Sequence, residues 1–159
     1  MQEYYGGGKF EEAWHHGREA IKYKNQTISG IYELIYEHFL EMSVIQKKSL
    51  EETKAIYEEA LAISITYPDF DAQYARYLCA QGKIEEGIKH FELCLDKMEK
   101  YRGTTLSMVI NKPLEMWNIV SDLYIQTNQG AKAIPLLINI LKVDPYQAKA
   151  LYNLILAVQ

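Results

Sequence analysis

The pattern Gly-Lys-apolar-Glu-Glu-small occurs twice in this chain, and such a repeated pattern limits the folds that the chain can adopt. It reads GKFEEA at residues 8–13 and GKIEEG at residues 82–87. Glycine favours a tight turn, and acidic side chains stabilise the first turn of a helix because they interact with the positive end of the helix dipole. Each copy therefore predicts a turn followed by a helix. Two copies indicate a fold built from repeated helical units.

The clearest full unit runs from residue 117 to residue 145. Large apolar residues recur in it at helical spacing, and small residues stand where two helices must approach closely. The residues of the pattern are Trp117, Val120, Ser121, Tyr124, Ala133, Leu137 and Pro145. This unit resembles the tetratricopeptide repeat family, whose pattern is Trp-x2-Leu-Gly-x2-Tyr, then Ala-x3-Phe, then Pro. Valine, serine and leucine replace the family's leucine, glycine and phenylalanine.

The same register fits three further units. Each unit would consist of a first and a second helix. The small residues that the pattern places on the second helices of the four units are Ala13, Thr53, Gly87 and Ala133. They stand 40, 34 and 46 residues apart, whereas the family period is about 34 residues. The outer two steps therefore carry insertions of about 6 and 12 residues relative to that period. We place the first near 24–30, where it would loosen the helix boundary, and the second within 100–113, as an ordered loop between units.

The other units depart from the pattern at single positions. Asp71 stands where the third unit would have tryptophan, and Gly87 stands where it would have alanine. In the second unit Glu41 takes a position that the family fills with a small residue, so this unit is the weaker match. The first unit supplies only Tyr4 from its first helix before it reaches Ala13.

The resemblance implies an all-α fold, a right-handed superhelical solenoid of about four helix pairs and a terminal helix. We expect a single domain over 1–159. Its repeats would cover 1–27, 28–66, 68–99 and 114–145, with the terminal helix at 147–159. Both ends look cut, and the last helix is apolar on several sides. Since solenoids need terminal units with polar outer faces, we expect a piece of a longer protein or a chain that pairs with another.

The charge and the cysteine content exclude several classes of protein. A net charge of -4 without any run of basic residues argues against binding to nucleic acid or to an anionic membrane. The longest apolar run, 134–143, is too short to span a bilayer. Two cysteines, Cys79 and Cys94, are too few for a disulfide scaffold, and we expect both to be small core residues. The first residues lack the regions of a signal peptide, so we expect a cytoplasmic protein.

Three short motifs could carry chemistry, and each has a simpler explanation. Glu12-x2-His15 has the spacing of metal ligands in helix bundles, but the chain holds one copy only, which favours a solvated helix face. Asp69-Phe70-Asp71 has the letters of a metal-binding Asp-x-Asp motif, yet Asp69 after Pro68 is a natural helix N-cap. The glycines at 6–8 lack the Gly-Lys-Ser/Thr of a phosphate loop. We therefore expect no catalytic residue, no metal and no cofactor.

The remaining candidate for function is the groove that the first helices of such repeats line. In this register its residues are His38, Met42, Gln73, Arg76, Asn118, Asp122, Gln126, Tyr152 and Asn153. Amides, an arginine and a tyrosine are suited to hydrogen bonding with an extended peptide or a polar ligand. For any single residue, ordinary exposure on a helix explains its position equally well. Only as a cluster do they indicate a binding site for a protein or peptide partner.

A more specific resemblance covers residues 62–103 and 130–151. The stretch Tyr67-Pro68-Asp69-Phe70, followed by Gly82 and then Glu85-Glu86-Gly87-Ile88, Phe91 and Cys94-Leu95, is similar to repeats that follow the catalytic domain in some bacterial family 2 glycosyltransferases. This resemblance implies a non-catalytic accessory module, with a covalently linked catalytic domain as its partner. The alternatives are a stand-alone adaptor and a dimerisation scaffold, for which a homodimer through the apolar last helix is an option.

Overall fold

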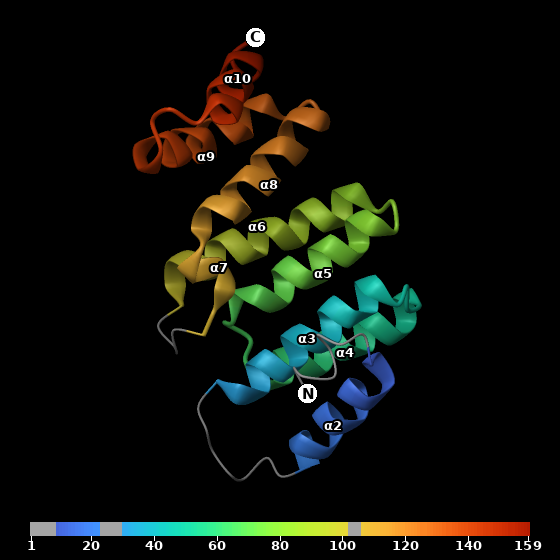
Figure 1. The fold of residues 1–159 in the computed structure, drawn as a ribbon. Coiled ribbons are helices and arrows are strands. Elements are labelled where there is room, and N and C mark those ends of the chain that lie inside the picture. The colour runs from blue at the N-terminus through green and yellow to red at the C-terminus, as the bar shows by residue number, and fades with distance from the viewer. Residues whose placement is uncertain (1–8, 23–29, 102–105) are drawn as a thin grey trace. The chain divides into compact units, whose positions relative to one another are not determined.

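The computed structural model describes residues 9–22, 30–101 and 106–159, and in these ranges every regular element is a helix (Figure 1). The all-α class is therefore confirmed for the described part of the chain. The chain forms two compact units, residues 1–107 and residues 108–159. We call them unit 1 and unit 2. The repeat boundaries and the single domain expected from the sequence stay predictions.

Unit 1 contains five described helices. They are α2 (Phe10–Lys22), α3 (Ile31–Ile45), α4 (Leu50–Ile63), α5 (Pro68–Ala80) and α6 (Ile84–Lys100). A capping box starts α4, because the Ser49 hydroxyl accepts the amide hydrogen of Glu52 while the Glu52 carboxylate accepts that of Ser49. Pro68 starts α5, since its fixed φ suits the first position of a helix and its missing N–H costs nothing there.

The repeated Gly-Lys-apolar-Glu-Glu motif is confirmed as a turn and a helix start at its second copy. Gly82 has a φ of 79°, in the left-handed region that glycine adopts without strain. The helix α6 then begins two residues later, with two glutamates in its first turn. At the first copy α2 begins at the same point of the motif, again with two glutamates in its first turn. The helix therefore starts at the same point of the motif in both copies, whereas Gly8, the glycine of the first copy, lies outside the described residues.

An aromatic core holds unit 1 together. The helix α5 contacts α3, α4 and α6, and α3 also contacts α2 and α4. The largest completely buried side chains are Phe39, Leu40, Met42, Tyr67, Phe70, Tyr77, Leu78 and Phe91. Burying one such side chain contributes about 1.5–3 kcal/mol. On α2, the Trp14 ring packs against Phe39 with 4.3 Å between centroids, and Arg18 pairs with Glu59 of α4 at 2.7 Å.

The helices α5 and α6 approach so closely that only glycine fits at position 87. A methyl group there would overlap the sulfur of Cys79 and would lie 3.2 Å from the carbonyl oxygen of Ala75. Gly87 therefore allows α6 to lie directly on the backbone of α5. This close contact explains why glycine replaces the alanine of the repeat pattern.

Unit 2 contains four described helices. They are α7 (Met108–Asn111), α8 (Pro113–Gln126), α9 (Gly130–Val143) and α10 (Ala148–Ala157). The helix α8 contacts α7, α9 and α10, and α9 also contacts α10. The completely buried side chains of unit 2 include Met116, Val120, Ser121, Ala133, Leu137, Ile140 and Ala150. The helix α9 ends two residues before Pro145, as the sequence predicts.

The two predicted insertions are described only in part. The segment 24–29, residues 102–105 and Tyr4 lie outside the described residues. The rest of the second insertion holds the end of α6 and the single turn of α7. Within the described ranges, no helix has both the length and the apolarity that crossing a bilayer requires.

Candidate functional site

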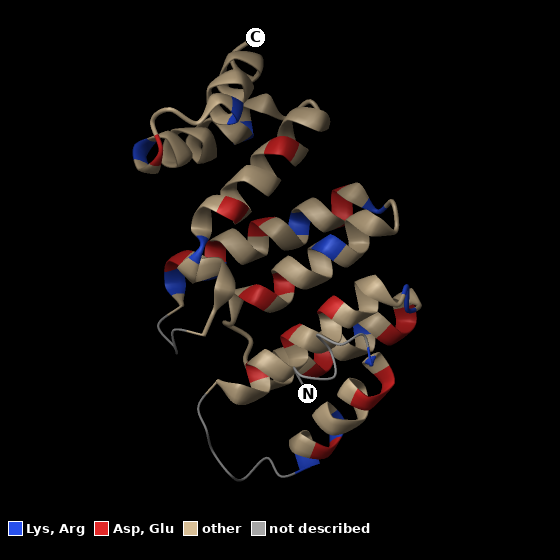
Figure 2. Cartoon of the chain, in the orientation of Figure 1, with Lys and Arg blue, Asp and Glu red and all other residues tan. Residues whose placement is uncertain are grey.

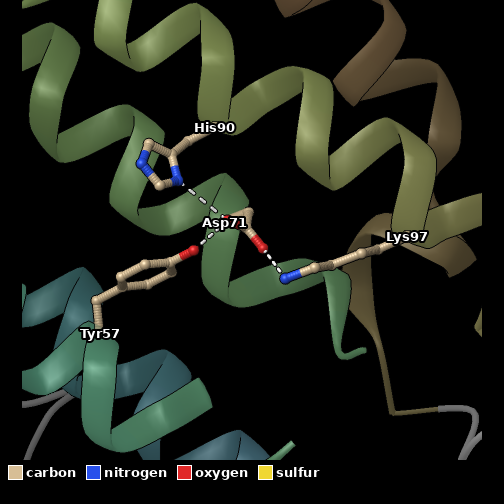
Figure 3. A network of polar contacts seen from close by, with 4 residues as sticks. All are labelled: Tyr57, Asp71, His90 and Lys97. Atoms are coloured by element: carbon tan, nitrogen blue, oxygen red, sulfur yellow. Dashed lines mark hydrogen bonds and ion pairs between the residues drawn. The ribbon is translucent and has the colours of Figure 1, made fainter. Parts of the chain in front are cut away.

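A buried carboxylate at the centre of unit 1 joins three helices. Asp71 of α5 is completely buried. The hydroxyl of Tyr57 on α4 donates a hydrogen bond to its Oδ1 at 2.5 Å, and Nδ1 of His90 on α6 lies 3.1 Å from the same oxygen. The ammonium of Lys97, also on α6, pairs with Oδ2 (Figure 3). All three partners point at one carboxylate, so α4 and α6 are both tied to α5.

The surroundings of Asp71 keep it ionised. Burial raises the pKa of Asp71, but hydrogen bonds from His90, Lys97 and Tyr57, together with the charge of Lys97, outweigh burial and hold the pKa below its ordinary value of 3.8. Burial and the adjacent carboxylate raise the pKa of Tyr57, so this phenol stays protonated and remains a donor. The network is therefore an ion pair with two further hydrogen bonds at neutral pH.

Aromatic rings enclose the histidine of this network. The rings of Tyr57 and Tyr74 stack with centroids 4.4 Å apart, and the His90 ring meets both edge-on at 5.2 Å and 4.8 Å. Among the described residues, the only hydrogen-bond partner of His90 is Asp71. An aspartate–histidine pair can activate a nucleophile, but here the imidazole faces two phenol rings. These contacts of His90 are all with residues of α4 and α5.

A second buried polar cluster of unit 1 contains two carboxyl groups, Glu37 of α3 and Asp69 of α5. Glu37 accepts a hydrogen bond from the Tyr67 hydroxyl at 3.2 Å, and Asp69 accepts one from the Ser107 hydroxyl at 2.5 Å. Burial, with the charge of Asp69 and a hydrogen bond to it, raises the pKa of Glu37 to about 9. Glu37 is therefore protonated at neutral pH.

The structure corrects the expected role of Asp69. The N-cap of α5 is Tyr67, which makes no side-chain cap hydrogen bond, and Asp69 is the second residue of the helix. The capping prediction was wrong because Pro68 starts the helix before Asp69 is reached. The side chains of Asp69 and Asp71 have different partners, Ser107 and Glu37 for the first and three helix-joining donors for the second.

In the described part of the chain, the acidic and the sulfur-containing side chains form no cluster that could hold a metal. Over the described ranges, no group of three or more His, Cys, Asp or Glu residues could hold a metal ion. Glu12 and His15 are both exposed on α2, as a solvated helix face would be. Cys94 is completely buried and Cys79 is half-buried; both are free, and burial raises the pKa of each thiol. Both therefore stay protonated at neutral pH.

The groove residues predicted in unit 1 lie on the neighbouring helices α3 and α5, with different exposure. Met42 on α3 is completely buried, and Gln73 on α5 is 9% exposed. His38 and Arg76 are half-buried, and the His38 ring lies 3.7 Å from the carboxylate of Glu41. None of the four side chains is therefore fully exposed, and that of His38 is 16% exposed.

The groove residues predicted in unit 2 include two that the structure brings together. Asn153 of α10 donates a hydrogen bond to Oδ1 of Asp122 on α8 at 2.8 Å, and Lys149 pairs with Oδ2 at 2.5 Å. Gln126 and Tyr152 are exposed. Asn118 is half-buried, and its amide donates to the carbonyl of Leu114 within α8. Polar side chains thus connect the two first helices of unit 2 directly.

Several residues of these clusters were missed by the sequence analysis. They are Glu37, Tyr57, Tyr67, Lys97, Ser107 and Lys149. A signal for one of them was present, because His90 and Lys97 are seven residues apart and so share one face of a helix. The acidic residue at the tryptophan position of the third unit was another signal, since a charge there must find partners.

Comparison with known proteins adds no family. A scan of the chain against protein-family models gives no match, and no curated protein matches its sequence. The tetratricopeptide resemblance therefore stays a prediction from the residues of the repeat pattern.

Proposed function

We propose that this chain is a non-catalytic helical-repeat module of the tetratricopeptide type, which binds a protein or peptide partner. The observation that carries the proposal is an order of packing that occurs in both units. In unit 1 the first helix α3 contacts its second helix α4 and the next first helix α5. In unit 2 the first helix α8 contacts α9 and the next first helix α10 in the same way. Repeats of this type wind into a right-handed superhelix whose first helices line a groove.

The first helices supply side chains suited to such a partner. In unit 2, Gln126 and Tyr152 are exposed beside the pair formed by Asp122 and Asn153. In unit 1, Arg76 and His38 are half-buried on adjacent first helices. Amides and an arginine can hydrogen-bond the carbonyls of an extended peptide, and a tyrosine adds apolar contact area.

The buried polar groups support a role other than catalysis. Asp71 is fully occupied by side chains from two neighbouring helices, and Glu37 and Asp69 bond to each other and to hydroxyls. Groups that act on a substrate need contact with it. Here the buried carboxyl groups with perturbed pKa values, Glu37 and Asp71, bond to side chains of neighbouring elements, as in structural networks.

A displayed library of random peptides, selected on the immobilised chain, tests this function. We expect enriched peptides that bind with micromolar affinity, and we expect Arg76→Ala on α5 to weaken binding about tenfold. The matched control is Lys89→Ala, which removes an exposed cation from the second helix α6 and should leave the affinity unchanged. If no peptide is enriched, or if both variants lose affinity equally, the proposed binding face is wrong.

The resemblance of residues 62–103 and 130–151 to glycosyltransferase repeats favours one setting for this module. We propose that it acts as the accessory domain of a bacterial family 2 glycosyltransferase, with a stand-alone adaptor as the alternative. The test is to assay the parent protein with nucleotide sugars, with and without these residues. Loss of acceptor selectivity with retained nucleotide-sugar hydrolysis would support an accessory role. A parent that transfers no sugar would leave only the adaptor.

A further inference from the structure

The last helix, α10, carries an apolar stripe that is exposed in unit 2. Leu151, Ile155 and Val158 follow the spacing i, i+4 and i+7, so they lie on one face, and they are 43%, 57% and 66% exposed. Tyr152 and Leu156 flank the stripe and are exposed as well. The face of α10 that packs within the unit is a different one, since it holds the buried residues Ala150 and Asn153. The stripe is therefore still exposed although α10 packs on α8 and α9.

The corresponding stripe of another first helix is covered by a helix. In α5 the same spacing selects Asp71, Ala75 and Leu78, and all three are at most 1% exposed. They face α6, because Asp71 pairs with Lys97 of α6 and the Ala75 carbonyl lies close to Gly87. In α8 the same spacing selects Trp117, Ser121 and Tyr124, and the last two of these are buried. The stripe of α10 thus has the register of a surface that packs against a helix.

We propose that this stripe is a self-association surface, which packs on the same stripe of a second copy of this chain. The two α10 helices would run antiparallel about a two-fold axis close to Ile155. The spacing supports this arrangement, since Ile155 lies near the middle of the stripe. Leu151 of one copy would then meet Val158 of the other. A surface that is complementary to itself in this way is what a two-fold dimer requires.

The charge of α10 also suits pairing with itself. Its only charged side chain is Lys149, and this ammonium is held by Asp122 of α8 at 2.5 Å. Figure 2 shows α10 nearly without charged residues, whereas the helices of unit 1 carry many. Two copies of the stripe can therefore meet without bringing like charges together.

The exposed apolar area is sufficient for a weak dimer. From their exposed fractions, the five apolar residues of the stripe and its flanks offer about 500 Å² per copy. Two copies would therefore bury about 1,000 Å², at the low end of the range for specific interfaces. Because not all of this area can be covered by one helix, we expect a dissociation constant on the order of 10 µM.

Sedimentation of the whole chain against concentration tests the proposal with a matched pair of variants. The wild type should pass from monomer to dimer as its concentration rises from about 1 to about 200 µM. Leu151→Asp should stay monomeric. Leu93→Asp on α6 should dimerise like the wild type, because Leu93 is 44% exposed and so matches Leu151 at 43%. Far-ultraviolet circular dichroism confirms that both variants are folded. A wild type that stays monomeric throughout, or a Leu151→Asp variant that dimerises equally, overturns the proposal.

A cross-link tests the position of the two-fold axis. In a Cys79→Ala background, Ile155→Cys should form a disulfide-linked dimer on mild oxidation, because residues at a two-fold axis between packed helices come within disulfide range. Leu93→Cys in the same background should not. Equal cross-linking of both variants would show random collision and would overturn the proposed arrangement. Neither experiment uses a peptide, so its outcome is independent of the proposed peptide-binding function.

Discussion

The two units differ at the position that the repeat pattern gives to tryptophan. In unit 1 the position of the pattern's tryptophan is taken by Asp71, a buried carboxylate with three donors from α4 and α6. In unit 2 the same position is Trp117, and a small buried residue, Ser121, stands one turn further along α8. The same position of the pattern therefore holds a buried ionic network in unit 1 and a half-buried indole in unit 2. We expect the two positions to differ in how much free energy of unfolding is lost when the residue is substituted.

The two units also differ in their number of charged residues. Residues 1–107 contain thirteen Lys or Arg and eighteen Asp or Glu, whereas residues 108–159 contain four and three. Two buried carboxyl groups that join helices, Glu37 and Asp71, have shifted pKa values, and both belong to unit 1. We therefore expect the stability of unit 1 to depend on pH more than that of unit 2. The tryptophans Trp14 and Trp117 lie in different units, so Trp→Phe variants allow fluorescence to follow each unit separately.

The largest effect is expected from Asp71→Ala. Removing the carboxylate leaves the ammonium of Lys97 partly buried without its ion pair and leaves two donors without an acceptor. Breaking a buried pair in this way costs about 3–5 kcal/mol. Urea unfolding followed by Trp14 should show this loss, while the transition followed by Trp117 should stay in place. If both transitions move together by the same amount, the two units do not differ as we describe.

Acid adds a check on the same residue. The pKa of Asp71 is lower in the folded chain than its ordinary value of 3.8, so its ionised form stabilises the fold above that value. This stabilisation is lost as the pH falls through the folded pKa. Asp71→Asn should therefore be less stable than the wild type at pH 6, and the gap should narrow below about pH 4.

The next effect is expected from Gly87→Ala. Alanine favours a helix over glycine by about 1 kcal/mol, but its methyl group would overlap the Cys79 sulfur and crowd the Ala75 carbonyl. We expect a net loss of about 2 kcal/mol in the unit 1 transition. Cys79→Ala in the same chain should restore about half of the loss, because it removes the sulfur. A neutral Gly87→Ala would show that α5 and α6 can separate without cost.

Glu37→Gln should stabilise unit 1. The pKa of Glu37 is about 9 in the folded chain against 4.5 ordinarily. The unfolded chain therefore releases this proton at a lower pH than the folded chain does, and stability falls as the pH rises from about 5 to about 9. Glutamine imitates the protonated acid, so we expect a gain of about 1–2 kcal/mol at pH 8 and none near pH 4. Thermal unfolding at several pH values measures it.

The control for that prediction is Glu58→Gln on α4, where the side chain is exposed. Its effect should stay within about 0.5 kcal/mol. A gain from Glu37→Gln that is the same at pH 4 and pH 8 would contradict the raised pKa of Glu37.

The smallest effect is expected from Ser49→Ala. This change removes the hydroxyl that caps α4 and leaves the amide of Glu52 without its side-chain partner. Losing such a cap costs about 1 kcal/mol. Calorimetry or urea unfolding followed by Trp14 should detect it, and Ser49→Asp should retain most of the stability because aspartate also caps. Equal stability of the alanine variant would mean that the capping box contributes little.

The sequence was informative where local rules decide the structure. The motif at 82–87 predicted a turn and a helix start, because glycine and a pair of glutamates act within one turn of the chain. The helix start at 68 was harder to place. Proline and aspartate both favour a helix N-terminus, and only the structure shows that Pro68 begins the helix while Asp69 bonds to Ser107.

The buried networks could not be derived in the same way. Asp71 was recognised as a departure from the repeat pattern, but its donors lie 14, 19 and 26 residues away along the chain. Helical periodicity places residues on a face, and it does not say which residue of another helix lies opposite. Groove assignments have the same limit. Asp122 on α8 and Asn153 on α10 form a hydrogen bond. Met42, which was assigned to the groove from the weaker second unit, is instead buried in the core.

The claim that the first helices carry the binding face is tested most directly by NMR. A peptide enriched from the random library would be titrated into the labelled chain, with Leu151→Asp as background so that self-association does not interfere. We predict amide shifts on α3, α5, α8 or α10, near residues such as Arg76 and Gln126, and none near Lys54 or Lys89 on the second helices. Shifts confined to α4, α6 or α9 would contradict the proposed function.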